Sequence, residues 1–285
     1  MGIEDFIKDS QILKDFLVER SRLIMVIGGS DTGKTTLVEG LAAFLSSHKR
    51  TAVVDLDMGQ SRIGVPTTVS WGMAREGFKG LTGVEEEGFY FTGALSPPGN
   101  LLPSIVGARK LADRALRACD KLIVDTTGLI EEPAGRALKR YKIDILRPDI
   151  IIGLERNREL SHILDPLRFQ KRHIIRRIPV PDKVKSKSRI KRAEWRAERF
   201  RGYFASSRVI EVSLDNTGVE FTRQSVRTGL KGRIVSFRDA LNEDMSLGII
   251  EGADFRKKRL LIRSPISPSQ EFTSIVIGSY IVNSI

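Results

Sequence analysis

The sequence predicts an α/β fold: a doubly wound, mostly parallel sheet followed by a small C-terminal all-β domain. Two observations predict the sheet. Short apolar runs alternate with helical patterns up to about residue 205, and the runs end in glycine or polar residues. A third observation predicts the β domain, because short β-rich pieces separated by turn residues follow one another from Ser206 onward. We therefore expect a core over residues 1–205 and a β domain over residues 206–285.

The composition is that of a soluble globular protein, with 41% hydrophobic and 29% charged residues in a chain of 285. No apolar run approaches the ~20 residues of a membrane span, and no signal peptide opens the chain, so we expect a cytoplasmic protein without a membrane partner. The single cysteine, Cys119, excludes an internal disulfide framework. The net charge of +12 favours a polyanionic partner. The composition leaves the oligomeric state unknown.

The elements of the core follow one another in a regular order. Apolar residues at helical spacing predict a helix over residues 3–20, which leads into a buried strand over residues 23–27. Residues 62–87 are rich in Gly, Pro and Thr, so we expect a long functional loop there. Further strands are expected at 51–57, 88–95, 121–128, 149–155 and 173–180, and helices at 34–47, 101–118, 132–145 and 158–169.

A complete G-x-x-x-x-G-K-[ST] motif lies between the first strand and the helix that follows it. Its glycines let backbone N–H groups turn inward, so that the loop and the helix N-terminus can hold phosphates. Lys34 would reach the β- and γ-phosphates, and the Thr35 hydroxyl would hold Mg²⁺. The core is therefore predicted to be a P-loop NTPase that binds a nucleoside triphosphate. The predicted nucleotide-binding residues are Gly28, Gly29, Ser30, Asp31, Thr32, Gly33, Lys34, Thr35 and Thr36.

Acidic residues end two further predicted strands of the core. Asp55 and Asp57 precede a Gly59-Gln60 pair, and Asp125 precedes Thr-Thr-Gly. A carboxylate beside the phosphate loop can accept the proton of an attacking hydroxyl, or reach Mg²⁺ directly or through water. Each of these aspartates could instead cap the turn that follows it, and the sequence leaves that alternative open.

A strongly basic segment runs from Arg168 to Arg201, and it overlaps a predicted lid over about residues 183–204. Within the lid, Arg192, Arg196 and Arg199 fall at i, i+4 and i+7, on one face of a predicted helix. Arginines on a lid can stabilise a transferred phosphoryl group, or hold a nucleic-acid backbone. A solvated basic face is the alternative.

At these motifs the chain resembles the polynucleotide 5′-hydroxyl kinase family, whose members include kinases of RNA 3′-end cleavage, tRNA splicing and pre-rRNA processing. The resemblance covers about residues 20–205 and is carried by GGSDTGKTT, VVDLDMGQSRIGVP, FTGALSPPGN, VDTTG and RAEWRAERFRGYF. It implies transfer of the γ-phosphate of ATP or GTP, with Mg²⁺, to the 5′-hydroxyl end of RNA or DNA.

The resemblance also implies roles for individual residues. Lys34, Asp57, Arg192 and Arg196 would be catalytic, with Asp57 as the base that activates the 5′-hydroxyl. Thr35, Asp57 and Asp125 would hold the metal. The residues expected to bind the substrate are Gln60, Ser96, Asn100, Arg199 and Arg201.

Trp71 is a further candidate for substrate binding, on different grounds. It lies in the predicted loop 62–87, where an aromatic ring could stack on a terminal base. Packing in the core is the alternative for this residue.

Two other classes of function remain open at this stage. One is a P-loop GTPase or ATPase switch, since VDTTG also occurs in such proteins, although no Asn-Lys-x-Asp motif follows the strand at 149–155. The other is a nucleic-acid-binding scaffold without kinase activity, because a basic face serves binding equally well.

Overall fold

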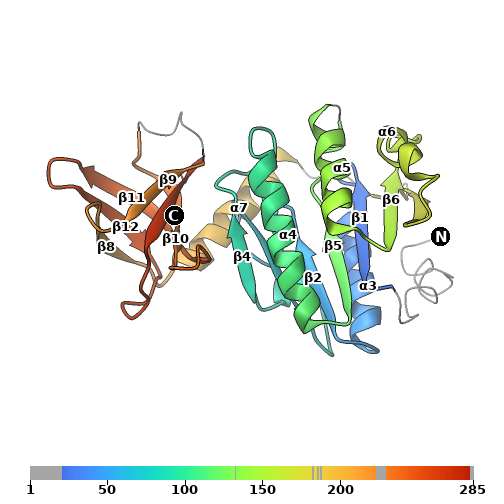
Figure 1. Cartoon of the computed structure of the whole chain (residues 1–285), viewed down its shortest axis with the longest axis horizontal. Helices are drawn as coiled ribbons and strands as arrows, with labels where there is room; N and C mark the ends of the chain where they lie inside the picture. The colour runs from blue at the N-terminus through green and yellow to red at the C-terminus, as the bar shows by residue number, and fades with distance from the viewer. Residues whose placement is uncertain are drawn as a thin grey trace.

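The structure, a computed structural model, describes residues 21–131, 133–181, 183–184, 186, 188–222 and 229–282. The helix expected over residues 3–20 lies outside these ranges. The described residues form two β-sheets, with the long helix α7 (Arg189–Phe204) at their junction (Figure 1). No helix in this part of the chain combines the length and the apolar composition needed to cross a bilayer.

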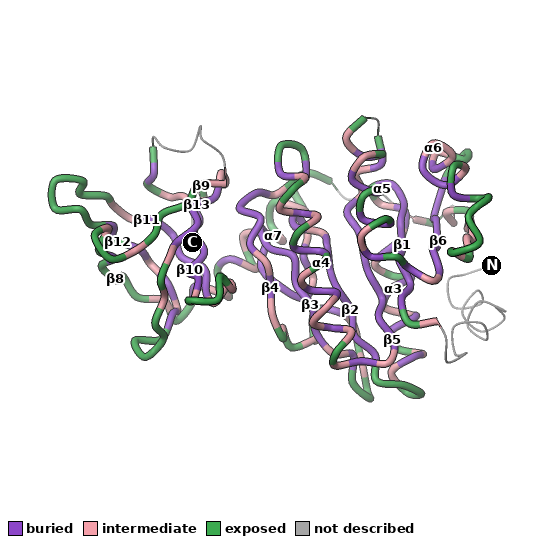
Figure 2. Tube along the Cα trace, in the orientation of Figure 1, coloured by how far each residue is buried: buried purple, intermediate pink, exposed green. Residues whose placement is uncertain are grey.

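The first sheet has seven strands in the order β4-β3-β2-β5-β1-β6-β7. Strands β2 to β4 pair with one another antiparallel, and all the other pairs are parallel. Every residue of β1, β2, β5 and β6 is buried, as expected for parallel strands covered on both faces (Figure 2). The strands are β1 (Leu23–Gly28), β2 (Thr51–Asp55), β3 (Thr68–Ala74), β4 (Gly88–Phe91), β5 (Lys121–Asp125), β6 (Ile150–Glu155) and β7 (Ile174–Pro179).

Helices cover both faces of this sheet. Helix α3 (Lys34–Ser46) lies on one face, and α4 (Leu101–Ala118) and α5 (Ala134–Leu146) lie on the other (Figure 1). Because successive strand side chains point to opposite faces, Ile24 packs in the cluster with α3 and Met25 in the cluster with α4 and α5. The predicted doubly wound, mostly parallel sheet is confirmed.

The second sheet has six strands in the order β8-β12-β11-β10-β13-β9, all antiparallel except the pair β9–β13. Side chains such as Val235 and Phe237 form a core of its own on one face, while Ile234 and Leu247 face the first sheet. The predicted C-terminal all-β region is confirmed. Its strands are β8 (Arg208–Ser213), β9 (Gly218–Phe221), β10 (Arg233–Arg238), β11 (Asp244–Asp254), β12 (Arg259–Ser264) and β13 (Ser274–Ile281).

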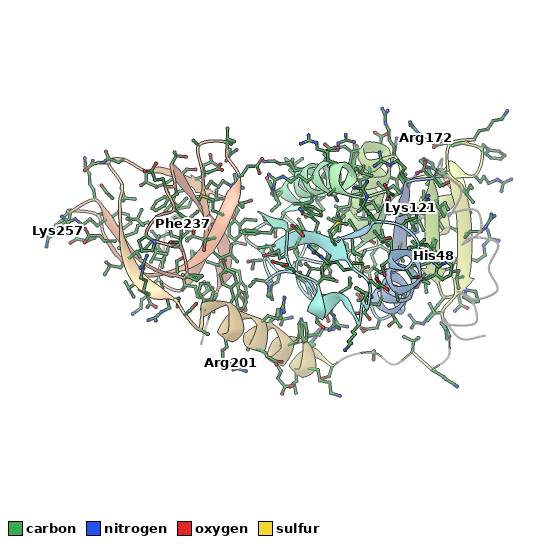
Figure 3. The ribbon with its side chains drawn as sticks, turned by 90° about the horizontal axis from the view of Figure 1, so that it is seen from below. His48, Lys121, Arg172, Arg201, Phe237 and Lys257 are labelled. Atoms are coloured by element: carbon green, nitrogen blue, oxygen red, sulfur yellow. The ribbon has the colours of Figure 1, made fainter. Side chains whose placement is uncertain are left out.

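Helix α7 is held between the two sheets at its C-terminal end. Phe200 and Phe204 are its two buried residues, at 1% and 3% exposure. They belong to one apolar cluster with Phe91 of β4 and with Ile234 and Leu247 of the second sheet. The N-terminal part of α7 contributes no residue to this cluster, and the helix extends from the junction at β4 along the first sheet (Figure 3).

Polar contacts reinforce the junction. The Asp244 carboxylate, on β11, accepts a hydrogen bond from the backbone N–H of Phe91 at 2.9 Å and pairs with Arg238 at 2.8 Å. On β13, which β10 separates from β11, the N–H of Ser279 donates to the carbonyl of Gly93 at 2.8 Å. The backbones approach so closely that a Cβ on Gly93 would lie 2.7 Å from the Cα of Gly278. The second sheet is therefore attached to β4 and α7 together.

Two predicted elements differ from the structure. The expected loop over residues 62–87 contains β3 and a 3₁₀ turn, η1 (Leu81–Gly83), and Gly72 inside β3 allows the backbone of Glu85 to approach. The expected helix over residues 158–169 is reduced to α6 (Ser161–Leu164) and a 3₁₀ turn, η2 (Asp165–Leu167). The proline within Asp165–Leu167 lacks an N–H donor, which favours the tighter turn.

We expect Phe200→Ala to lower the free energy of unfolding by about 3–5 kcal/mol, because it leaves a cavity between the two sheets. Phe169→Ala is the matched control, since Phe169 is 80% exposed and should cost little. Urea unfolding of both variants measures the difference. Equal stabilities for the two variants would show that the junction is not packed as described.

Candidate active site

The phosphate loop has the predicted place and shape. Strand β1 ends at Gly28, α3 begins at Lys34, and Asp31 and Gly33 adopt left-handed conformations with φ of 52° and 88°. Lys34 is 7% exposed, and its Nζ donates to the carbonyl oxygen of Gly29 at 2.5 Å. Burial lowers the pKa of Lys34, while the neighbouring carboxylates partly oppose this effect.

A cavity of about 210 Å³ opens over the phosphate loop. It joins the loop to residues that follow β2, as expected if the carboxyl ends of parallel strands form one site. Asp57 and Gln60 are among them. The lining residues are Ser30, Asp31, Thr32, Gly33, Lys34, Thr35, Thr36, Asp57, Gln60, Arg62 and Val184.

Two carboxylates meet beside the phosphate loop at the end of the sheet. Asp55 and Asp125 are paired in register at the ends of β2 and β5, and they are 1% and 2% exposed. Burial raises the pKa of both carboxyls, and the charge of Asp125 raises that of Asp55 further. The Thr35 hydroxyl donates to Asp125 Oδ2 at 2.9 Å, which links this pair to the phosphate loop.

The structure separates the roles of Asp55 and Asp57. Asp55 Oδ2 accepts hydrogen bonds from the backbone N–H of Arg62 at 2.6 Å and from the Ser61 hydroxyl at 3.2 Å, so Asp55 fixes the turn after β2. Asp57 Oδ1 accepts from the N–H groups of Gly59 and Gln60 at 3.0 and 3.1 Å, while the residue also lines the cavity. Asp55 therefore caps the turn, as the alternative reading held. Asp57 also caps the turn, but in addition it lines the cavity.

The oxygen donors fit a magnesium ion bound with a nucleotide. Asp125 Oδ1 is buried and accepts no hydrogen bond within the described ranges, and the Thr35 hydroxyl lies against Oδ2 of the same residue. No group of three His, Cys, Asp or Glu side chains in the described part of the chain could hold a metal without other ligands. Mg²⁺ in phosphotransferases is commonly bound by one or two carboxylates together with substrate phosphates and water.

Two buried lysines that the sequence motifs did not indicate lie beneath the site. Lys139 Nζ donates to the Thr126 hydroxyl at 2.8 Å and to the Thr127 carbonyl at 2.5 Å, so it holds the loop after β5. Lys142 Nζ has no hydrogen-bond partner among the residues described. Their signal in the sequence was their spacing, because both lie on the apolar face of α5 with Leu138.

The lid arginines point to different places. Arg192 pairs with Asp31 of the phosphate loop at 2.5 Å, so the lid reaches the loop. Arg196 is partly buried. Arg199 instead donates to the backbone carbonyls of Ile63 and Gly64 at 2.8 and 2.6 Å, and the exposed Arg201 lies on the outer side of α7 (Figure 3). None of these four arginines is among the residues that line the cavity, and Arg192 reaches its wall only through Asp31.

The segment expected to bind the substrate end lies against the turn that holds Asp57. A Cβ on Gly59 would lie 2.4 Å from the Leu95 carbonyl oxygen, so the two backbones are in contact. Ser96 is exposed, whereas Asn100 is 2% exposed and its amide donates to the Ser96 carbonyl at 3.3 Å. Asn100 therefore shapes this segment from inside the protein.

The prediction that Trp71 stacks on a substrate base is wrong. Trp71 lies within β3 and not in a loop, and it is 7% exposed. Its ring belongs to the apolar cluster under α4, together with Val69 and Leu111. Packing in the core, the alternative reading of this residue, is what the structure shows.

Comparison with known proteins shows which family the phosphate-loop core matches. A family model described as the mRNA cleavage and polyadenylation factor CLP1 P-loop matches residues 28–206. A polyribonucleotide 5′-hydroxyl-kinase of Pyrococcus abyssi is 38% identical over 200 residues, which cover 70% of this chain and 55% of that protein. A protein of the same name from Methanocaldococcus jannaschii is 37% identical over 218 residues, which cover 76% and 57%. The chain thus spans about half the length of the curated relatives it matches.

A solved structure shows the same fold over nearly the whole chain. A structure of wild-type Clp1p in complex with Pcf11p superposes with a TM-score of 0.78 over 98% of this chain and 78% of that chain. The sequence identity is 15%, so this likeness concerns the fold alone. It includes the second sheet, which the family model, ending at residue 206, does not cover.

We expect Gly128→Ala to weaken nucleotide binding at least ~10-fold, because its Cβ would lie 2.4 Å from the Ser30 hydroxyl and 2.7 Å from the Ser30 backbone nitrogen. Ser30 would have to move, and the phosphate loop with it. Calorimetric titration with ATP measures the change. Gly83→Ala serves as the control, since a Cβ there meets no atom within 4 Å. Unchanged affinity in Gly128→Ala would contradict the close packing of the two loops.

We expect Lys142→Met to raise the free energy of unfolding by roughly 1–3 kcal/mol at pH 7. Burial lowers the pKa of Lys142 from 10.5 to about 8, so the folded state gives up this proton more readily than the unfolded chain does. The lysine therefore opposes folding fully below pH 8, and this penalty disappears as the pH rises toward 10.5.

Urea unfolding at pH 7 and pH 10 tests this, with Lys257→Met as the control because Lys257 is exposed (Figure 3). The gain for Lys142→Met should shrink at pH 10. A loss of stability at pH 7 would mean that the Lys142 charge is paired in solution.

Proposed function

Because the chain belongs to the CLP1 P-loop family, we propose that it is a polynucleotide 5′-hydroxyl kinase, which transfers the γ-phosphate of ATP or GTP to the 5′-hydroxyl end of RNA or DNA. The observation that carries this proposal is the single cavity that Asp57 and Gln60 share with Lys34 and Thr35. It provides a base and a phosphate-binding loop within reach of the same reacting atoms.

Each group of the site has a task in such a transfer. Backbone N–H groups of the phosphate loop bind the triphosphate, and Lys34 neutralises the β- and γ-phosphate oxygens. Asp57 accepts the proton of the attacking 5′-hydroxyl, and Gln60 beside it orients the acceptor. Arg192 and Arg196 of the lid stabilise the charge that develops on the transferred group. Mg²⁺, when bound at Thr35, Asp57 and Asp125, would neutralise further phosphate charge.

A nucleic acid is the acceptor that fits the charge of the chain. The net charge of +12 attracts a polyanion, and the lid places basic residues beside the cavity. We place the protein in the cytoplasm, where its one free cysteine, buried Cys119, would stay reduced.

A transfer assay tests the proposal directly. The protein is incubated with Mg²⁺, γ-labelled ATP or GTP, and short 5′-hydroxyl RNA and DNA oligonucleotides, beside Lys34→Ala. Label on the 5′ end that is lost in Lys34→Ala would support the kinase and rank its substrates. If no oligonucleotide accepts label from either nucleotide, the proposal fails, and a nucleotide switch or a nucleic-acid scaffold takes its place.

We expect Asp57→Asn to lower kcat by about 10²–10⁴-fold, the usual contribution of a general base, and to change nucleotide affinity only a few-fold. Single-turnover kinetics and ATP titration separate the two effects. Asp215→Asn is the matched control, since Asp215 is exposed at the start of the β8–β9 turn. If Asp57→Asn lost nucleotide binding to the same extent as activity, Asp57 would serve to retain nucleotide or metal.

A further inference from the structure

Arg62 lines the cavity over the phosphate loop, and neither the motifs nor the family resemblance assigns it a role. Its backbone is fixed, because its N–H donates to the buried carboxylate of Asp55 at 2.6 Å. Asp57 and Gln60 line the same cavity, five and two residues before it in the chain. Arg62 therefore stands in a rigid turn at the side of the cavity where the base and the acceptor are expected.

The side chain of Arg62 is held by the lid. Its guanidinium carbon lies 4.4 Å from the centre of the Trp195 ring, within the range of a cation–π interaction. Trp195 lies in α7 between Arg192, which pairs with Asp31, and Arg199, which donates to Ile63 and Gly64 carbonyls. The helix is thus anchored on both sides of Trp195, whose ring offers its face to Arg62.

The charge of Arg62 is not matched by a neighbouring acid. Within the ranges that the structure describes, it forms no ion pair with an aspartate or glutamate side chain. Arg199, the other arginine over the Trp195 ring at 5.9 Å, already uses its donors on backbone carbonyls. A cation that is fixed in place, stacked on one face and without an acidic partner has donors available for an anion.

We propose that Arg62 binds a phosphate group of the reactants and that Trp195 is the residue that positions it. This inference rests on the proposed kinase function for the identity of the reactants. An arginine can bind phosphate through two parallel N–H···O bonds, which fixes orientation as well as charge. Stacking on Trp195 holds the guanidinium plane in one orientation before the ligand arrives, so less freedom is lost on binding.

Two phosphate groups could come within reach of this cavity. One is the γ-phosphate of the donor, bound on the phosphate loop, and the other is the first internucleotide phosphate of the acceptor strand. Both present the same chemistry to a guanidinium. They are distinguished by removing one charge at a time from the ligands.

The experiment uses Arg62→Ala, Arg62→Lys, Trp195→Leu, Trp195→Phe and the double variant Arg62→Ala/Trp195→Leu in the full chain. Arg256→Ala is a matched control on the exposed turn between β11 and β12. Binding of ATP and of ADP is measured by calorimetry. Transfer is measured with two acceptors, an oligonucleotide with an ordinary first linkage and one with an uncharged methylphosphonate there. Thermal unfolding checks that each variant is folded.

Arg62→Ala should lower kcat/KM by about 10- to 100-fold, the usual effect of losing a charged hydrogen-bond donor, while Arg62→Lys should keep part of the activity. Trp195→Leu should lower it by about 3- to 10-fold, and Trp195→Phe by less, because phenylalanine keeps an aromatic face. In the Arg62→Ala background, Trp195→Leu should have no further effect, since the tryptophan acts through the arginine.

The pattern across ligands identifies the phosphate group. If Arg62 binds the acceptor, the wild type prefers the ordinary linkage over the methylphosphonate, and Arg62→Ala loses that preference. If it binds the donor, Arg62→Ala weakens ATP binding more than ADP binding and affects both acceptors equally. The proposal is overturned if folded Arg62→Ala matches Arg256→Ala in binding and transfer, or if the two substitutions are additive.

Failure of the kinase proposal gives a different result. The wild type would then phosphorylate neither acceptor. The role of Arg62 would still be decided by equilibrium binding of ATP, ADP and the two oligonucleotides. Wild-type and Arg62→Ala proteins with equal affinities for all four ligands would overturn it in that case.

Discussion

Asp55 and Asp125 end neighbouring strands of a buried sheet in register, so two carboxylates meet where there is almost no water. Burial opposes the ionisation of both carboxyls; the charge of Asp125 adds to this effect at Asp55, whereas Lys34 counters it at Asp125. Three buried lysines surround this region, and the Asp55 and Asp125 oxygens accept hydrogen bonds from the turn after β2 and from Thr35. The positions of the phosphate loop and of the Asp57 turn thus depend on the hydrogen bonds and charges that stabilise these two carboxyls.

The second sheet acts on the site through the lid, without reaching the cavity itself. It contributes no residue to the lining of the cavity, but it packs against Phe200 and Phe204 at one end of α7. At the other end of the helix, Arg192 reaches the phosphate loop. The packing therefore favours a role for this domain in supporting the lid over a role in contacting the substrate. Because the second sheet holds one end of α7, a movement of that sheet can move the arginines at the other end of the helix.

Much of the fold could be predicted because its signals are local. Buried parallel strands appear as continuous apolar runs, and the phosphate loop has a fixed spacing of glycine, lysine and threonine. Strand β3 was missed because Gly72 and the Gly, Pro and Thr residues around the strand make the segment resemble a loop, while its stability comes from pairing with β2 and β4. Trp71 was misjudged as a consequence, since its role followed from the loop assigned to it.

The sequence predicted the site residues that belong to a motif. It did not predict those whose positions depend on contacts with distant parts of the chain. Lys34, Asp57 and Gln60 meet in one cavity, as their places at strand ends indicate. The direction of each lid arginine could not be read from helical spacing, because Arg192 and Arg199 meet partners more than 100 residues away. The stacking of Arg62 on Trp195 joins residues 133 positions apart, and no local pattern predicts it.

The packing of α7 also determines the order in which buried surfaces are covered while this protein is synthesised on the ribosome. The phenylalanines of β4 and α7 are synthesised well before the strands β10, β11 and β13 that cover them. At ~5–20 residues per second, the gap between Phe204 and Ile281 lasts on the order of 4–15 seconds. During that interval the nascent core presents an uncovered aromatic surface, the kind of surface that chaperones bind. The final strand, β13, closes it.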